Sequence, residues 1–241
     1  MTAQAAAADH GVLLPQHSED TMLKTSLWRL LGTLALATTV LGCASVKPVP
    51  YNELASAPSL TPNQGDDAAT IAYRYAPPVN WRAYDKLIID PVAIYRAPDN
   101  QFGDLPESDK ASLAAFMQEQ FTQKLAPRFQ ITTVAGPKTL RLKLTLTGVV
   151  KTTPVLGTLS RFDLMGGLYN GVQSIRGGEG TFTGAVIYAA EFYDAGTSQL
   201  LAASIIKQYP NALNIGASFG ALGAARTGIE KGAEKMAEQL Q

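Results

Sequence analysis

Alternation of apolar and polar residues marks the clearest strand of the chain. From Leu140 to Leu146 every second residue is leucine, and the residues between them are arginine, lysine and threonine. This period of two is typical of a strand with one buried face. Residues 84–95 contain the continuous run Leu87-Ile88-Ile89, which indicates a strand covered on both faces. Three further strands are predicted, at residues 129–134, 181–193 and 199–209, the last two joined by a Gly-containing turn.

Two segments show the spacing of a helix instead. Between Leu113 and Leu125 apolar side chains recur at helical intervals, and Pro127 ends the pattern. The second helix is predicted from about Ala221 to the carboxyl end, where Gly228 and Gly232 continue a four-residue repeat of small residues. Each glycine inside a helix costs about 0.8–1 kcal/mol relative to alanine, so a close contact should compensate. Either the glycines rest on the sheet, or they pack against a helix of another subunit.

The order of these elements predicts the fold class. A β-α-β-β-β-β-α order favours an α+β two-layer domain. We expect a mostly antiparallel sheet of about five strands, with both helices packed on one of its faces.

An apolar run near the amino terminus predicts a cleaved targeting segment. Lys24 and Arg29 form a short basic head, residues 30–41 are uncharged and mostly apolar, and Gly42 precedes Cys43, the only cysteine of the chain. The run of roughly twelve residues is too short to span a bilayer, which takes about twenty. We expect Met22 to be the true start and residues 1–42 to be a leader and signal peptide.

The residues around Cys43 resemble the bacterial lipobox. The resemblance implies cleavage between Gly42 and Cys43, a diacylglycerol on the Cys43 thiol and an N-acyl chain such as palmitate. Ala44 stands where an aspartate would resemble an inner-membrane retention signal, so the resemblance implies the inner leaflet of the bacterial outer membrane, facing the periplasm. The alternative is that Cys43 is an ordinary buried thiol.

The stretch after the cysteine contains several prolines. They recur between residues 48 and 78, which indicates a flexible, Pro-rich tether over residues 43–81 and a single globular α+β domain over residues 82–241. Tyr73, Tyr75 and Trp81 either lay the entering chain onto the domain or form an aromatic ligand cluster.

Composition limits the chemistry that this domain can perform. Both histidines, His10 and His17, precede Met22, and the single thiol is expected to carry lipid. Cysteine nucleophiles, Ser-His-Asp triads and Cys or His metal sites each lose a member, so we predict no catalytic residue, no metal and no cofactor beyond the lipid. From residue 43 onward the chain holds 18 basic and 17 acidic side chains, and this balance argues against nucleic acid as a partner.

Glycines interrupt every period between residues 151 and 180. The segment Arg176-Gly177-Gly178-Glu179-Gly180 lacks both the Walker pattern and the strand-to-helix context of a dinucleotide-binding loop. We therefore expect it to be an interaction loop, because long loops in compact domains often carry function.

Two motifs resemble a known family. The segments Tyr84-Asp-Lys-Leu-Ile-Ile-Asp-Pro-Val92 and Glu191-Phe-Tyr-Asp-Ala-Gly-Thr-Ser-Gln-Leu-Leu-Ala-Ala203 are similar to the bacterial lipoprotein family known as domain of unknown function 3313. The resemblance implies an envelope lipoprotein without an assigned activity or catalytic residues.

These observations together predict a non-enzymatic binding or scaffold protein of the cell envelope. Its expected partners are the membrane, through the lipid, and an envelope protein, lipid or glycan. A first alternative is a homo-oligomeric envelope assembly that packs through the Gly-rich carboxyl-terminal helix. A second is a hydrolase that works without histidine.

Overall fold

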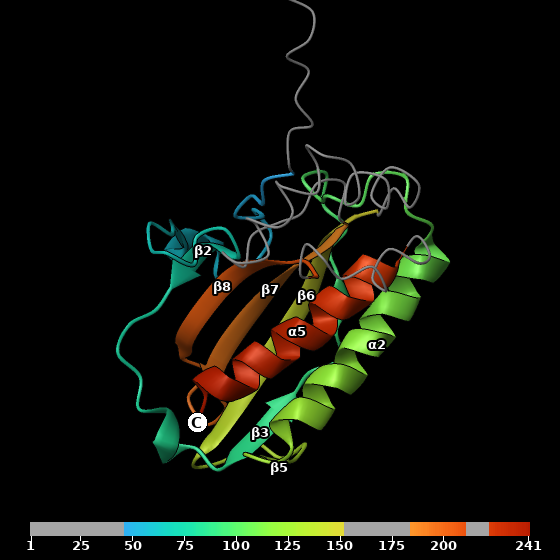
Figure 1. The fold of residues 1–241 in the computed structure, drawn as a ribbon. Helices are drawn as coiled ribbons and strands as arrows, with labels where there is room; N and C mark the ends of the chain where they lie inside the picture. Colours follow the sequence, from blue (N-terminus) through green and yellow to red (C-terminus); the bar gives the residue numbers. More distant parts are fainter. Residues whose placement is uncertain (1–45, 152–183, 211–221) are drawn as a thin grey trace, which may run out of the picture. The chain divides into compact units, whose positions relative to one another are not determined.

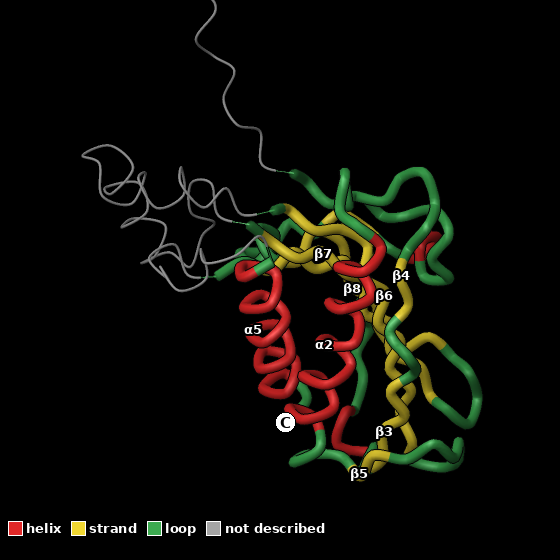
Figure 2. The backbone as a smooth tube through the Cα atoms, turned by 90° about the vertical axis from the view of Figure 1, so that its right-hand side faces the viewer, coloured by secondary structure: helices red, strands yellow, loops and turns green. Residues whose placement is uncertain are grey.

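The computed structural model describes residues 46–151, 184–210 and 222–241. Within these residues eight strands form one sheet, and two α-helices lie side by side over one of its faces (Figure 1). The elements are η1 (Ala57–Ser59), β1 (Thr61–Pro62), β2 (Ile71–Tyr75), η2 (Trp81–Ala83), β3 (Lys86–Ile89), β4 (Ala93–Ile94), α2 (Glu107–Leu125), β5 (Gln130–Ile131), β6 (Thr139–Val150), β7 (Ala185–Asp194), β8 (Leu200–Gln208) and α5 (Gly223–Gln239), where η denotes a 3-10 helix. The α+β class, with both helices on one face, is confirmed; Figure 2 shows the two layers edge-on.

The sheet joins an antiparallel half to a parallel one. Its order is β1-β2-β8-β7-β6-β3-β5, with β4 pairing along β6. The pairs from β1 to β6 are antiparallel, whereas β3 pairs in parallel with both β6 and β5. The chain therefore crosses from β3 through α2 to the parallel strands β5 and β6, as the predicted strand-helix-strand order requires.

The main core lies between the helices and the sheet. The alternating leucines of β6 are all buried there, at 0 or 1% exposed, and they meet Leu113, Met117 and Phe121 of α2. Tyr188 of β7 contacts the ring of Phe121 edge-on, with the ring centroids 5.7 Å apart. The alternating leucines of β6 and the helically spaced apolar residues of α2 thus form the two sides of one apolar interface.

Residues 46–60 lie against the opposite face of the sheet. The side chains of Tyr51 and Leu54 are buried there beside Ile187 and Ile205. The backbone N–H of Ser56 donates to the buried carboxylate of Glu191 at 2.8 Å. The flexible tether predicted over residues 43–81 is therefore wrong from residue 46 onward.

Two prolines of this segment lie in ordered elements of the domain. Pro58 lies in η1, and Pro62 lies in β1, the outermost strand beside β2, where a missing backbone N–H costs no ladder hydrogen bond. The compact unit that contains the α+β domain begins at Val46 rather than at residue 82.

Two glycines set the distance between α5 and the sheet. A Cβ on Gly228 would lie 2.7 Å from the carbonyl oxygen of Gln208, and one on Gly232 would collide with the Tyr188 hydroxyl. No side chain fits at either position, so the interpretation that these glycines rest on the sheet is confirmed. The preceding repeat members, Gly216 and Gly220, lie outside the described residues.

We expect Gly228→Ala to lower the free energy of unfolding by about 1–3 kcal/mol, as overpacking does. Alanine alone would favour the helix by about 1 kcal/mol, so the sign of the change tests the contact. Chemical denaturation measures it, and Gly136→Ala is the control, because a Cβ there meets nothing within 4 Å. A stabilised Gly228→Ala variant would contradict the close approach.

Candidate functional site

A groove lies between the carboxyl-terminal half of α5 and strands β2 and β8. It contains a larger pocket of about 210 Å³ and a smaller one of about 70 Å³. Both pockets are lined by Asp67, Ile71, Ile206, Met236 and Gln239, so they adjoin each other, and we call the two together the α5–β2 groove.

Small side chains on the sheet make room for the larger pocket. Ala190 of β7 pairs with Ser204 of β8, and Phe192 pairs with Ala202. Strand β6, which lies beside β7, carries leucines on this face of the sheet. The paired positions of β7 and β8 carry mainly alanine and serine instead. The floor of the groove is therefore lower than the floor beneath α2.

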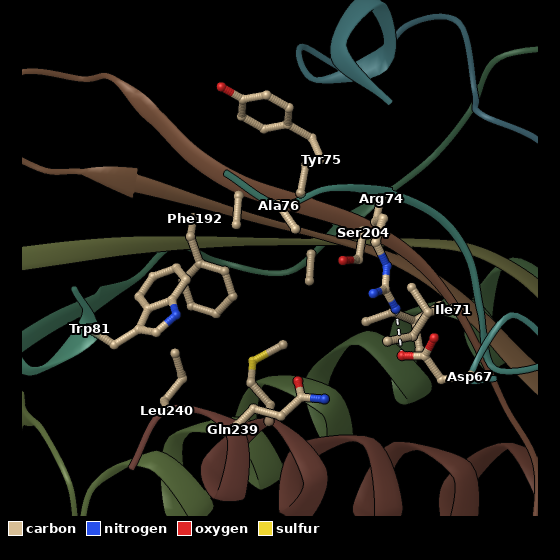
Figure 3. Close-up of a pocket in the computed structure, with 15 residues that line it drawn as sticks. Asp67, Ile71, Arg74, Tyr75, Ala76, Trp81, Phe192, Ser204, Gln239 and Leu240 are labelled. Carbon is tan, nitrogen blue, oxygen red and sulfur yellow. Dashed lines mark hydrogen bonds and ion pairs between the residues drawn. The ribbon is translucent and has the colours of Figure 1, made fainter. Parts of the chain in front are cut away.

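Trp81 and Leu240 close the apolar end of the groove. Trp81, in η2, contacts the ring of Phe192 edge-on at a centroid distance of 5.3 Å. Leu240 follows α5 directly and lines the pocket beside Trp81 (Figure 3). Two segments that are remote in sequence thus form one apolar wall.

Arg128 holds these two segments together. Its Nη2 donates to the carbonyl oxygens of Trp81 and Tyr84 at 3.2 and 3.1 Å, and its Nε donates to the carbonyl oxygen of Leu240 at 3.3 Å. The guanidinium group also lies over the ring of Phe129. Hydrogen bonds from a charged donor to several carbonyls fix the geometry more firmly than neutral ones.

An ion pair forms the β2 side of the groove. Arg74 Nη2 contacts Asp67 Oδ2, and Asn63 Nδ2 donates to Asp67 Oδ1 at 2.8 Å. Partial burial alone would raise the pKa of the Asp67 carboxyl, but the hydrogen bonds from Asn63 and Arg74 and the Arg74 charge lower it overall. Asp67 is therefore ionised at neutral pH, and its charge is balanced within the wall.

The smaller pocket gives the groove a polar end. It is lined by Thr70, Tyr188, Gln208 and Lys235 in addition to the shared residues. Gln208 is 3% exposed, and its Oε1 has no hydrogen-bond partner among the described residues. Tyr188 is fully buried, and burial raises the pKa of its hydroxyl, which therefore stays protonated as a donor.

The structure separates the aromatic residues that the sequence grouped together. Tyr73 packs on the opposite face of the sheet with Ile205. The ring of Tyr75 turns away from the groove, whereas the ring of Trp81 borders it (Figure 3). Gly42, Cys43 and the predicted interaction loop, residues 176–180, lie outside the described residues.

Sequence reasoning missed the α5–β2 groove. Its β2 wall lies in the stretch that was assigned to a tether, and the only signal for it was the apolar and aromatic composition of residues 71–75.

Within the described part of the chain, no group of three or more His, Cys, Asp or Glu residues could hold a metal ion. No helix among those residues is long and apolar enough to cross a bilayer.

The family model described as "Protein of unknown function (DUF3313)" matches residues 50–236. The chain belongs to this family. The match confirms the resemblance drawn from residues 84–92 and 191–203. The DUF3313 match also includes most of the segment that the sequence assigned to a tether, in agreement with its packed structure. No curated protein sequence matches the chain significantly.

Two solved structures are remotely similar to this DUF3313 protein. The PelC dodecamer from Paraburkholderia phytofirmans is 11% identical and covers 66% of this chain and 92% of its own, with a TM-score of 0.33. A neuraminyllactose-binding hemagglutinin homolog from Helicobacter pylori is 11% identical and covers 66% of this chain and 83% of its own, with a TM-score of 0.32. At these scores the similarities carry no argument about ligand or assembly.

We expect Arg128→Gln to loosen the apolar end of the groove, because three carbonyl oxygens lose a charged donor. The free energy of unfolding should fall by about 1.5–3 kcal/mol. In a Trp28→Phe background Trp81 is the only tryptophan, and its fluorescence should shift to longer wavelength. Arg96→Gln is the control, since that side chain is 67% exposed. An unchanged emission spectrum would show that Arg128 does not position Trp81.

Proposed function

We propose that this DUF3313 protein is a non-enzymatic lipoprotein of the bacterial outer membrane, anchored through Cys43 and facing the periplasm. In this proposal it binds an apolar or amphiphilic component of the envelope in the α5–β2 groove. The observation that carries the proposal is the groove itself, an open depression with apolar walls and a polar end.

The size and lining of the groove suit a small apolar group. An engineered apolar cavity of about 150 Å³ binds benzene, so a pocket of about 210 Å³ has room for one ring system or one alkyl segment of a larger molecule, the rest of which can lie in the open part of the groove. Ligand sites are mostly apolar, with a few polar groups that orient the ligand. Trp81, Phe192 and Met236 supply apolar surface, and Ser204 and Gln239 supply the polar groups.

The polar groups of the larger pocket favour binding over catalysis. Its carboxylate, Asp67, is held by Arg74 and Asn63, and its pKa is lowered, so at neutral pH it is a weak proton acceptor and holds no proton to donate. A general acid or base would need a pKa near the working pH and a reach to substrate.

The packed amino-terminal segment changes what the anchor would do. Only Ala44 and Ser45 separate Cys43 from Val46, the first described residue, and a chain of that length spans about 11 Å at most. A lipid at Cys43 would therefore keep the domain at the membrane surface instead of on a long tether.

We expect the mature protein to start at an acylated Cys43 when it is produced in a bacterium with its own signal. Mass spectrometry of the membrane fraction should find the acylated amino-terminal peptide, and Cys43→Ser should abolish both the acylation and the cleavage before residue 43. Ser45→Ala, which leaves the lipobox intact, is the control. An unmodified Cys43 thiol in the native protein would contradict the anchor.

We expect the Cys43→Ser full chain to bind the apolar fluorophore N-phenyl-1-naphthylamine. Ala202→Phe places a ring in the larger pocket and should weaken this binding about tenfold or more, because the fluorophore loses its apolar contacts. Ala135→Phe adds the same ring at an exposed loop and should change nothing. Equal affinity in the two variants, or no binding by the parent protein, would contradict the groove as a ligand site.

A further inference from the structure

The two ends of the α5–β2 groove differ in charge as well as in polarity. At the apolar end, Trp81, Phe192 and Leu240 surround the larger pocket. At the other end, Lys235 lines the smaller pocket and Lys231 lies one helical turn before it on the same flank of α5. A molecule that fills the groove therefore meets apolar surface at one end and positive charge at the other.

The two lysines lack a counter-ion in the described part of the chain. Neither forms an ion pair with a described carboxylate. Among the described residues, Lys231 Nζ donates to the carbonyl oxygen of Tyr209, at 3.4 Å, and lies over the ring of the same tyrosine. Burial, and then the neighbouring Lys235 charge, lower the pKa of Lys231. An anion between the lysines and the smaller pocket would relieve this repulsion.

One buried polar group of the smaller pocket also lacks a partner among the described residues. The side-chain amide of Gln208 is buried, and its Oε1 has no hydrogen-bond partner among the described residues. An amide can turn either its oxygen or its nitrogen toward a ligand, so Gln208 can donate to an anion through Nε2. The Tyr188 hydroxyl lies in the same pocket lining and is protonated.

We propose that the groove binds a single-chain anionic amphiphile, with its alkyl chain in the larger pocket and its acidic head in the smaller one. This proposal rests on the proposed binding function and adds the class and the orientation of the ligand. In this orientation the acidic head faces the Lys235 ammonium, the Gln208 amide and the Tyr188 hydroxyl, which line the smaller pocket and can donate hydrogen bonds to it. The alkyl chain lies along Ile71, Ile206 and Met236, which line both pockets.

Two features of the groove are consistent with this orientation. The Asp67 carboxylate also lines both pockets, but its charge is balanced by Arg74, so it does not repel the head as a free carboxylate would. The smaller pocket, at about 70 Å³, is several times the roughly 10–15 Å³ that one water needs, so it has room for a head group of a few heavy atoms, such as a carboxylate or a phosphate.

The test measures how well ten-carbon amphiphiles displace N-phenyl-1-naphthylamine from the Cys43→Ser full chain. Decanoate and decyl phosphate carry the anionic head as a carboxylate and as a phosphate, decanol carries none, and decyltrimethylammonium carries a cation. We expect at least one anion to displace the fluorophore at a concentration about tenfold lower than the cation does. The better anion identifies the head group as a carboxylate or a phosphate.

Lys235→Gln should reduce the advantage of the anion about tenfold and leave the affinity for decanol and for the fluorophore unchanged, since one charged donor is lost. Lys124→Gln is the matched control, because that lysine pairs with Glu234 on the other flank of α5. Equal displacement by anion and cation, or an unchanged advantage in Lys235→Gln, would overturn the orientation while fluorophore binding still supports the groove. A parent protein that binds no fluorophore would instead overturn the proposed binding function.

Discussion

The contact of the α5 backbone with the sheet determines the rest of this structure. Because Gly228 and Gly232 carry no side chain, the helix lies directly on the Gln208 carbonyl and the Tyr188 hydroxyl. Because α5 lies this close to the sheet, Met236 reaches into the main core, while Gln239 stays exposed beside β2. A larger residue at either glycine would lift the helix, so one helix packs the core and also forms one wall of the groove.

Two kinds of residue form the groove: small side chains on the sheet, and wall residues that hydrogen bonds and an ion pair keep in position. Alanine and serine on β7 and β8 leave space that leucines occupy on β6. Arg128 ties Trp81 to the end of α5, and the Asp67–Arg74 pair holds β2. These constraints preorganise the apolar end without a ligand, which lowers the entropic cost of binding. The polar end, with Lys235 and Gln208, keeps unused hydrogen-bonding capacity.

Local sequence patterns were sufficient to predict the elements that have one apolar face and one polar face. The alternation from Leu140 to Leu146, the helix ending near Leu125 and the glycines of α5 all predicted the contacts that the structure shows. Residues 46–81 were misjudged because their prolines resemble those of a spacer, although Tyr51 and Leu54 are buried. The groove could not be predicted, since its lining comes from segments far apart in the chain, and only the tertiary fold places Trp81 beside Leu240.

The most direct test of the groove is photo-crosslinking with an alkyl chain that carries a diazirine at its end and an acidic head. The structure predicts that, on irradiation of the full chain with Cys43→Ser, the label attaches to peptides that contain Trp81, Phe192 or the end of α5. Labelling of peptides from the opposite face of the sheet, such as those with Tyr51 or Tyr95, and not of these, would contradict a ligand bound between α5 and β2.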